Sequence, residues 1–226
     1  MTGALFQNRR EAGRRLAMAL GRFTKDTPLI LALPRGGVPV AYEVAHALNA
    51  PLDLLLVRKI GAPGHEEYGI GAVIDGADPQ LVLNEDVVRQ VLPSPEYIRS
   101  EMHRQIIELE RRRRIYLGDR KPPNLSGRTV IIVDDGIATG GTMKAALRGA
   151  RKNSPTKLVL AVPVAPKEAI EMMHDECDEI ICLATPDPFL AVGKCYADFD
   201  QTEDDEVKQL LQHAKERLRH VHSKSD

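Results

Sequence analysis

Short apolar runs alternate with longer amphipathic stretches along most of this chain. The runs at 29–33, 52–57, 130–133, 158–164 and 179–183 consist largely of aliphatic residues. Runs of this kind are typical of strands that are buried on both faces of a parallel sheet. The stretches at 8–23, 38–48, 143–151 and 167–174 carry apolar residues at helical spacing. Alternating strands and helices predict an α/β fold with a parallel sheet and right-handed crossovers.

The middle and the end of the chain depart from this alternation. Residues 59–69 hold three glycines and a proline and are predicted to form a loop. Segments 70–74 and 81–83 flank an Asp-Gly turn and predict a hairpin, and a long helix is predicted over 93–117. Residues 185–200 show no regular pattern, and Thr202 is a candidate N-cap for a last helix. We therefore expect a single domain over 1–226 with a hairpin and helix inserted at 70–120.

Composition indicates an ordinary water-soluble domain. The chain has 226 residues, of which 43% are hydrophobic, and its net charge of −1 gives no overall attraction to nucleic acid or membranes. The run Arg111–Arg114 is the local exception. We interpret it as a solvated helix face, because Glu108 and Glu110 each precede an arginine by four residues.

Three observations indicate a reduced, cytoplasmic protein. The three cysteines form no Cys-x-x-Cys pair, so neither a disulfide framework nor a zinc site is predicted. Arginines occupy positions 9, 10, 14 and 15, where a signal peptide needs apolar residues. No apolar run reaches the ~18 residues of a membrane-spanning helix. We expect no nucleic-acid or membrane partner.

Residues 130–142, Val-Ile-Ile-Val-Asp-Asp-Gly-Ile-Ala-Thr-Gly-Gly-Thr, carry the most informative pattern. A buried strand ends at the carboxylates Asp134 and Asp135, and a Gly/Thr loop then leads into a helix. Glycines and a helix N-terminus offer backbone N–H groups to an anion, so the loop suits a phosphate. The two carboxylates can accept hydrogen bonds from a sugar diol. Phosphate and diol on one turn predict recognition of a ribose 5-phosphate.

This stretch resembles the phosphoribosyl pyrophosphate motif of the type I phosphoribosyltransferases. Other nucleotide motifs do not fit, since the chain has neither a Gly-x-x-x-x-Gly-Lys-Ser/Thr loop nor a Gly-x-Gly-x-x-Gly helix start after a strand. The resemblance implies a three-layer fold in which a mostly parallel sheet has helices on both faces. It also implies one antiparallel edge strand and a small C-terminal hood, with the hood and last helix over 185–226. In this arrangement the first strand lies beside the motif strand.

The resemblance implies three binding tasks for residues of this chain: to hold the 5-phosphate, the ribose and the pyrophosphate of the substrate. The 5-phosphate falls to the loop residues Ala138, Thr139, Gly140, Gly141 and Thr142, and the ribose to Asp134 and Asp135. The turn Pro34–Gly37 resembles the family's pyrophosphate loop, in which Arg35 would hold two oxygens at once and Gly36 and Gly37 would allow close approach. Lys59, in preference to Arg58, resembles a basic residue that reaches the pyrophosphate. Arg35, Lys59, Asp134 and Asp135 are thus the candidate catalytic residues.

The acceptor and metal assignments rest on looser similarity. Residues 60–69 occupy the place of the family's mobile lid, where His65 or Tyr68 would act near the acceptor. The segment 189–199 resembles the base-binding part of purine enzymes, which makes Phe189 a stacking platform and Asp198 a magnesium ligand. The lid lacks the lysine of orotate enzymes and the Ser-Tyr pair of purine enzymes, and the Gly193-to-Asp198 gap is one residue longer than usual. Magnesium is expected to be held mostly by the substrate.

The resemblance implies a magnesium-dependent transfer of a phosphoribosyl group from phosphoribosyl pyrophosphate to a nucleobase or related nitrogenous acceptor. It also implies a homodimer. Two alternatives remain open at this stage. One is a regulator that binds phosphoribosyl pyrophosphate without turning it over, and the other is a hydrolase or phosphorylase in which water or phosphate attacks the ribose. The sequence does not name the acceptor.

Overall fold

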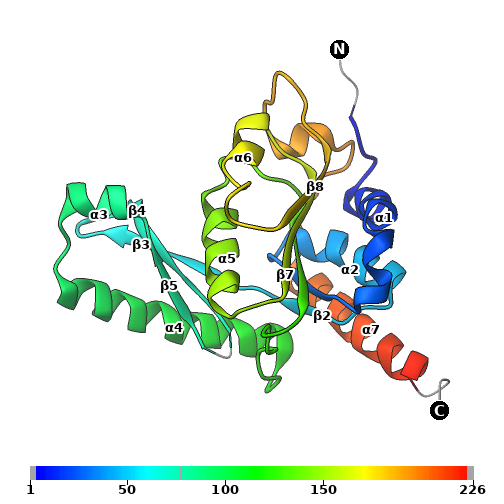
Figure 1. The fold of residues 1–226 in the computed structure, drawn as a ribbon, viewed down its shortest axis with the longest axis horizontal. Helices are drawn as coiled ribbons and strands as arrows, with labels where there is room; N and C mark the ends of the chain where they lie inside the picture. The colour runs from blue at the N-terminus through cyan, green and yellow to red at the C-terminus, as the bar shows by residue number, and fades with distance from the viewer. Residues whose placement is uncertain (1–3, 77, 223–226) are drawn as a thin grey trace.

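The computed structural model describes residues 4–76 and 78–222 of the chain (Figure 1). Its centre is a five-stranded parallel sheet in the order β2-β1-β6-β7-β8. The strands are β1 (Leu29–Ala32), β2 (Leu52–Leu54), β6 (Thr129–Val133), β7 (Lys157–Val164) and β8 (Glu179–Ala184). The first strand lies beside the motif strand, as the resemblance implied. The strand order reverses between β1 and β6, and open α/β sheets bind ligands at such a switch point.

Helices cover both faces of this sheet (Figure 1). One face carries α1 (Arg9–Ala19), α2 (Gly37–Leu48) and α7 (Asp204–His222), and the other carries α5 (Gly141–Lys152) and α6 (Lys167–Glu171). Along β6, Ile131 and Val133 pack into the core of the first face, and Val130 and Ile132 into the core of the second. All four are fully buried, which explains the unbroken aliphatic run. The predicted three-layer α/β fold is confirmed.

Residues 57–117 form a second unit, which we call the arm, and it extends to the left of the parallel sheet in Figure 1. It holds an antiparallel sheet of β3 (Val57–Ala62), β4 (His65–Ile74) and β5 (Gln80–Leu83), followed by α3 (Glu85–Val91) and α4 (Pro95–Leu117). Ile60 and Ile70 share a core with α4, while Ala72 and Ile74 share one with α5. The antiparallel strands therefore form a sheet of their own instead of an edge of the main sheet.

Several local predictions in this region need correction. Residues 59–69 do not form a loop, because β3 and β4 pair as a hairpin that turns at Pro63 and Gly64. The strand predicted over 52–57 is divided between β2 and β3, and α3 was not predicted. The hairpin of 70–74 with 81–83 and the helix over 93–117 are confirmed, although Ala77 in the connecting turn lies outside the described residues.

The helix ends show which local signals were informative. The Asn8 side chain accepts a hydrogen bond from the Glu11 N–H at 3.0 Å, which fixes the start of α1. The helix ends at Ala19 and is followed by a 3-10 turn, so its predicted end at residue 23 was too late. The last helix begins at Asp204, which places Thr202 outside the capping position. The residues after His222, which were included in the hood and last helix, lie outside the described part of the chain.

A buried ion cluster joins the arm to the parallel sheet. Arg113 of α4 donates to Asp75 Oδ2 at 2.7 Å and to Asp53 Oδ1 at 2.8 Å, and Arg120 lies 3.0 Å from Asp53 Oδ2. The Asp53, Asp75 and Arg113 side chains are at most 9% exposed. The interpretation of the arginine run as a solvated face is therefore wrong for Arg113, although it holds for Arg111 and Arg112, which pair with Glu108.

The hood is built from both ends of the chain. Residues 185–200 are irregular, as predicted, and include one 3-10 turn at Val192–Cys195. The N–H groups of Leu5 and Phe6 donate to the Cys195 carbonyl oxygen, and the Ala197 N–H donates to the Phe6 carbonyl oxygen. The residues before α1 thus run alongside the hood. Within the described ranges, none of the helices has the length and apolar character needed to cross a membrane.

Candidate active site

The motif loop joins β6 to α5 at the switch point of the sheet. Ala138, Thr139, Gly141 and Thr142 are exposed, and α5 begins at Gly141. Gly140 is the N-cap with φ of 81°, a left-handed conformation that favours glycine. The first N–H groups of α5 have no partner within the helix and carry the positive end of its dipole. The loop therefore has the form of an anion site.

The second predicted loop lies directly beside the first. Gly36 is so close to Asp135 that a Cβ atom there would overlap Asp135 Oδ2. A Cβ atom at Gly37 would lie 2.8 Å from the Val133 carbonyl oxygen. The peptide bond between Pro34 and Arg35 is cis. Two glycine turns from distant parts of the sequence therefore meet at one place, because β1 lies beside β6.

The two motif carboxylates differ in environment. Asp134 Oδ1 accepts a hydrogen bond from the Asp135 N–H at 2.8 Å. Burial, and then the charge of Asp135, raise the pKa of Asp134 well above its usual range. Asp135 Oδ2 instead forms an ion pair with Arg9 Nε at 2.7 Å. The pair thus combines a carboxyl whose pKa is raised by burial with a carboxylate that is paired with an arginine.

Arg9 is a site residue that sequence reasoning missed. Besides its ion pair with Asp135, its guanidinium donates to the Asp200 carbonyl oxygen and lies 3.8 Å from the centre of the Phe199 ring. Its side chain is only 12% exposed. The contact with Asp135 spans 126 positions, and no local pattern around Arg9 indicates it. The one available signal was the Asn8 cap, which makes Arg9 the first residue of α1.

The backbone of Arg35 lies in the turn beside the motif acids, but its guanidinium group points toward the start of α7. It lies 3.5 Å from Asp204 Oδ1 and 3.8 Å from Glu203 Oε2. The Tyr116 hydroxyl of α4 donates to the same Asp204 oxygen at 2.7 Å. Because both acids are more than half exposed, these ion pairs are weak and exchangeable.

Lys59 and Arg58 point to opposite sides of β3. Arg58 donates to Gln105 of α4 at 2.9 Å. Lys59 is exposed and lines a groove of about 1030 Å³ that also includes Gly141 and Thr142 at the start of α5. Strand alternation therefore places Lys59, and not Arg58, on the groove that reaches the motif loop. Asp134, Asp135 and Arg35 do not line the groove.

The residues suggested for the acceptor are dispersed. His65 and Tyr68 lie on β4 toward the tip of the arm, where the Tyr68 hydroxyl donates to Gln90 of α3 at 3.3 Å. Neither lines the groove. Phe189 packs against the hood core that contains Phe6. The structure therefore does not bring these three together.

The metal assignment has little support from side-chain geometry. Asp198 is exposed, and its Oδ1 accepts the Asp200 N–H at 3.3 Å. Across residues 4–76 and 78–222, no group of three or more His, Cys, Asp or Glu side chains is arranged to hold a metal ion.

Comparison with known proteins agrees with this geometry. The family model described as the phosphoribosyl transferase domain matches residues 5–199. The chain belongs to the phosphoribosyl transferase domain family. A Mycobacterium tuberculosis protein whose name assigns it provisionally to the phosphoribosyl transferases is 47% identical over 210 residues. That match covers 93% of this chain and 47% of the relative, so the chain spans about half the length of the curated relatives it matches.

A solved structure shows that the whole fold is shared. A crystal structure of a Thermus thermophilus protein is 41% identical in sequence and superposes with a TM-score of 0.77. The match covers 92% of this chain and 98% of that one, so the unmatched part of this chain is much smaller than the arm. The arm is therefore a regular part of this fold and not a peculiarity of one sequence.

Proposed function

We propose that this chain catalyses the magnesium-dependent transfer of a phosphoribosyl group from phosphoribosyl pyrophosphate to a nitrogenous acceptor, with release of pyrophosphate. The observation that carries the proposal is the meeting of the two glycine turns beside Asp134 and Asp135. One turn supplies helix N-terminal donors, and the other supplies a close backbone approach and Arg35. Membership of the phosphoribosyl transferase domain family supports the same reading.

Each task then falls to particular groups. The N–H groups and hydroxyls of Ala138–Thr142 bind the 5-phosphate. The side chains of Asp134 and Asp135 form hydrogen bonds with the ribose hydroxyls. Arg35 leaves its exposed acidic partners to bind the pyrophosphate, toward which Lys59 reaches from the groove. Magnesium, when bound with the pyrophosphate, supplies positive charge that favours its departure.

The segment assigned as a mobile lid, residues 60–69, is the tip of the β3–β4 hairpin, and we assign the lid function to this tip. Its turn at Pro63 and Gly64 is exposed, and Gly64 has φ of 74°. A closing hairpin would keep water away from the ribose carbon while the bond to pyrophosphate breaks. Deleting residues 63–66 should leave ribose 5-phosphate affinity within about threefold. The same deletion should lower turnover about 100-fold.

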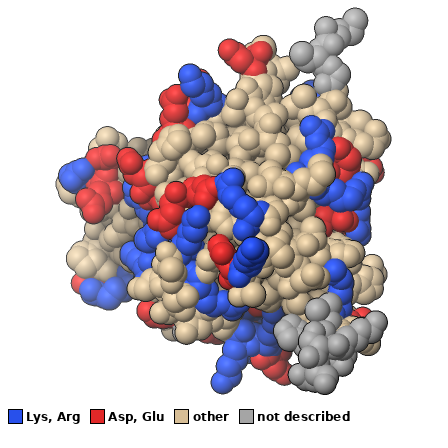
Figure 2. Space-filling view, turned by 45° about the vertical axis from the view of Figure 1, so that its right-hand side comes forward, with Lys and Arg blue, Asp and Glu red and all other residues tan. Residues whose placement is uncertain are grey.

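A regulator that binds phosphoribosyl pyrophosphate without turnover is the competing function. On the face drawn in Figure 2, Lys and Arg side chains are intermixed with Asp and Glu, which does not favour a nucleic-acid surface there. Pyrophosphate release, measured with magnesium and a panel of purines, pyrimidines, pyridine carboxylates and small amines, tests the proposal. Release with one class of acceptor supports it. Binding of phosphoribosyl pyrophosphate without release by any acceptor favours the regulator, and release in water or phosphate alone indicates a hydrolase or phosphorylase.

The motif carboxylates provide a second test. The double substitution Asp134→Asn with Asp135→Asn should weaken ribose 5-phosphate binding by at least about 2 kcal/mol, the scale of charged hydrogen bonds lost at a site. Calorimetry measures this directly. Unchanged affinity in the double variant would remove the assignment of the ribose to these residues.

A further inference from the structure

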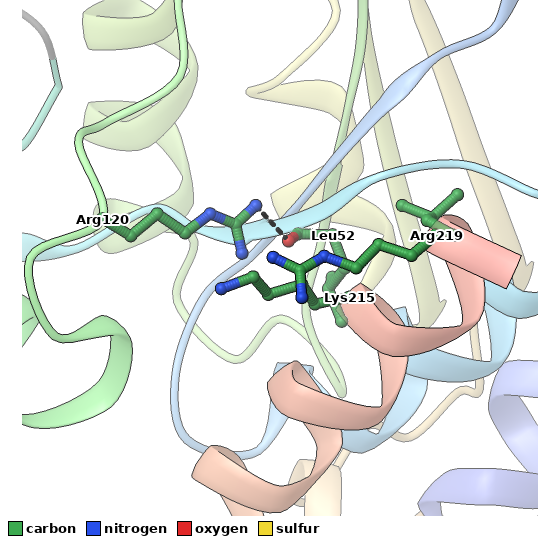
Figure 3. Close-up of a pocket in the computed structure, with 5 residues that line it drawn as sticks. Leu52, Arg120, Lys215 and Arg219 are labelled. Atoms are coloured by element: carbon green, nitrogen blue, oxygen red, sulfur yellow. Dashed lines mark hydrogen bonds between the residues drawn. The ribbon is translucent and has the colours of Figure 1, made fainter. Parts of the chain in front are cut away.

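A small cavity lies between α7, β2 and the segment that follows α4 (Figure 3). Its volume is about 330 Å³, and its lining consists of Leu52, Arg120, Lys215, Leu218 and Arg219. Lys215 and Arg219 lie one helical turn apart on α7, so they share a face. Figure 3 shows their charged ends and the Arg120 guanidinium gathered around one space.

The local charges do not balance. Arg120 donates to the Leu52 carbonyl oxygen at 3.1 Å and lies 3.0 Å from Asp53 Oδ2. Together with Arg113, it is neutralised by the two carboxylates of the buried ion cluster. Lys215 and Arg219 form no ion pair within the described part of the chain. Among the described residues, the cavity therefore carries a surplus of two positive charges.

The dipole of α7 can account for Arg219, which lies in the last turn, but not for Lys215 or Arg120. Cations near a helix C-terminus are favourable, but the effect falls off within the last turn. Lys215 lies more than one turn before the end of α7 at His222. Arg217 instead contacts the end of α2, where it donates to the His46 carbonyl oxygen and to Asn49 Oδ1. Nor does the dipole explain why Arg120, from another segment, points to the same space.

We propose that this cavity binds a phosphoryl dianion, either inorganic phosphate or the phosphate of a nucleoside monophosphate. Two surplus charges match a dianion, and two guanidinium groups can each hold two of its oxygens. Leu52 and Leu218 give the cavity an apolar wall against which an ester group can lie. Leu52 begins β2, whereas the motif loop follows the end of β6. Because the strands are parallel, the cavity lies near the amino ends of the strands, whereas the candidate active site lies at their carboxyl ends. The cavity is therefore a separate site.

The test compares a cavity variant with a charge-matched control. Lys215→Gln with Arg219→Gln removes two exposed cations from the cavity, and Lys25→Gln with Arg114→Gln removes two exposed cations from elsewhere. The probe is inorganic phosphate at pH 8 and constant ionic strength, followed by calorimetry. We expect the wild type and the control to show a binding class that is at least about tenfold weaker in the cavity variant, since charge-assisted hydrogen bonds are lost. A motif-loop site remains in all three proteins.

Crystals soaked in tungstate locate the anion. An anomalous peak among Arg120, Lys215 and Arg219 in the wild type, absent from the cavity variant, supports the proposal. No peak in the wild type, identical phosphate isotherms in all three proteins, or an equal loss in the control would each overturn it. Titration with adenosine monophosphate separates the two sources. An affinity like that of phosphate indicates the free ion, and one at least about tenfold tighter indicates an ester that uses the apolar wall.

Discussion

Replacing Arg113 with methionine should reveal how much the buried ion cluster contributes to stability. The substitution leaves the carboxylates of Asp53 and Asp75 without the guanidinium that joins them at 2.8 and 2.7 Å. Breaking a buried pair by removing one partner costs roughly 3–5 kcal/mol. Asp53 keeps Arg120 at 3.0 Å, and Asp75 keeps the Leu56 N–H at 2.6 Å. We therefore expect the lower end of that range, about 3 kcal/mol at pH 8.

The same variant should become more sensitive to pH. Burial raises the pKa of Asp75 to about 6, even though Arg113 lowers it. A carboxyl whose pKa is higher in the folded state binds protons on folding, so its contribution to stability falls as pH rises and levels off above the folded pKa. Without Arg113 the folded pKa is higher still. Between pH 6 and pH 8 the variant should therefore keep losing stability relative to the wild type, by at most about 1.4 kcal/mol per pH unit.

Urea unfolding followed by far-UV circular dichroism measures both effects, since the chain has no tryptophan. Arg112→Met is the matched control, because Arg112 is the preceding residue and pairs with Glu108 on the surface. It should cost about 0.5 kcal/mol or less. Equal losses in the two variants would refute the reasoning about the cluster. A deficit of Arg113→Met that does not change between pH 6 and pH 8 would refute the assignment of the titration to Asp75.

Three further outcomes follow from the site and the cysteines. At Gly36 the φ of −59° permits alanine, but the new Cβ atom would overlap the Asp135 carboxylate. Gly36→Ala should therefore lower the affinity for ribose 5-phosphate, measured by calorimetry, at least about tenfold. Gly21→Ala is the control and should leave this affinity unchanged, because a Cβ atom there has no neighbour within 4 Å. Arg9→Gln should lower the free energy of unfolding by about 2 kcal/mol, and an unchanged urea midpoint would contradict the role given to its ion pair. Burial raises the pKa of Cys177 to about 11, so alkylation at pH 8 should be roughly 100-fold slower than for a peptide cysteine; labelling at the peptide rate would count against that burial.

The sequence predicted the parts of this fold whose cause is local. Val130–Val133 is aliphatic because both faces of its strand are covered, and that pattern needs no knowledge of the partners. The Asn8 cap and the Gly/Thr loop likewise act on the backbone next to them. The division of 52–57 between two sheets was missed because it depends on where the chain turns, and the residues on both sides of the break are equally apolar.

The missed site residues have non-local causes. The glycines in 59–69 suggested a loop, yet β3 and β4 pair through this segment, and a Cβ atom at Gly69 would meet nothing within 4 Å. Arg9 and Arg113 looked like ordinary surface cations, and only the folded chain brings them to Asp135, Asp53 and Asp75. A charged residue with a distant buried partner leaves no periodic signal in one sequence.

The pairing of residues 5–7 with the hood has a practical consequence for work with this protein. The Asp198 N–H donates to the Gln7 carbonyl oxygen, next to the bonds between Phe6 and the hood. Two residues later, Arg9 reaches the carboxylate of Asp135. A purification tag or cleavage scar placed ahead of residue 5 would therefore be joined to a segment that contacts both the hood and Asp135. Proteins that differ only in their N-terminal extension should be compared before any difference in ligand affinity is credited to a substitution.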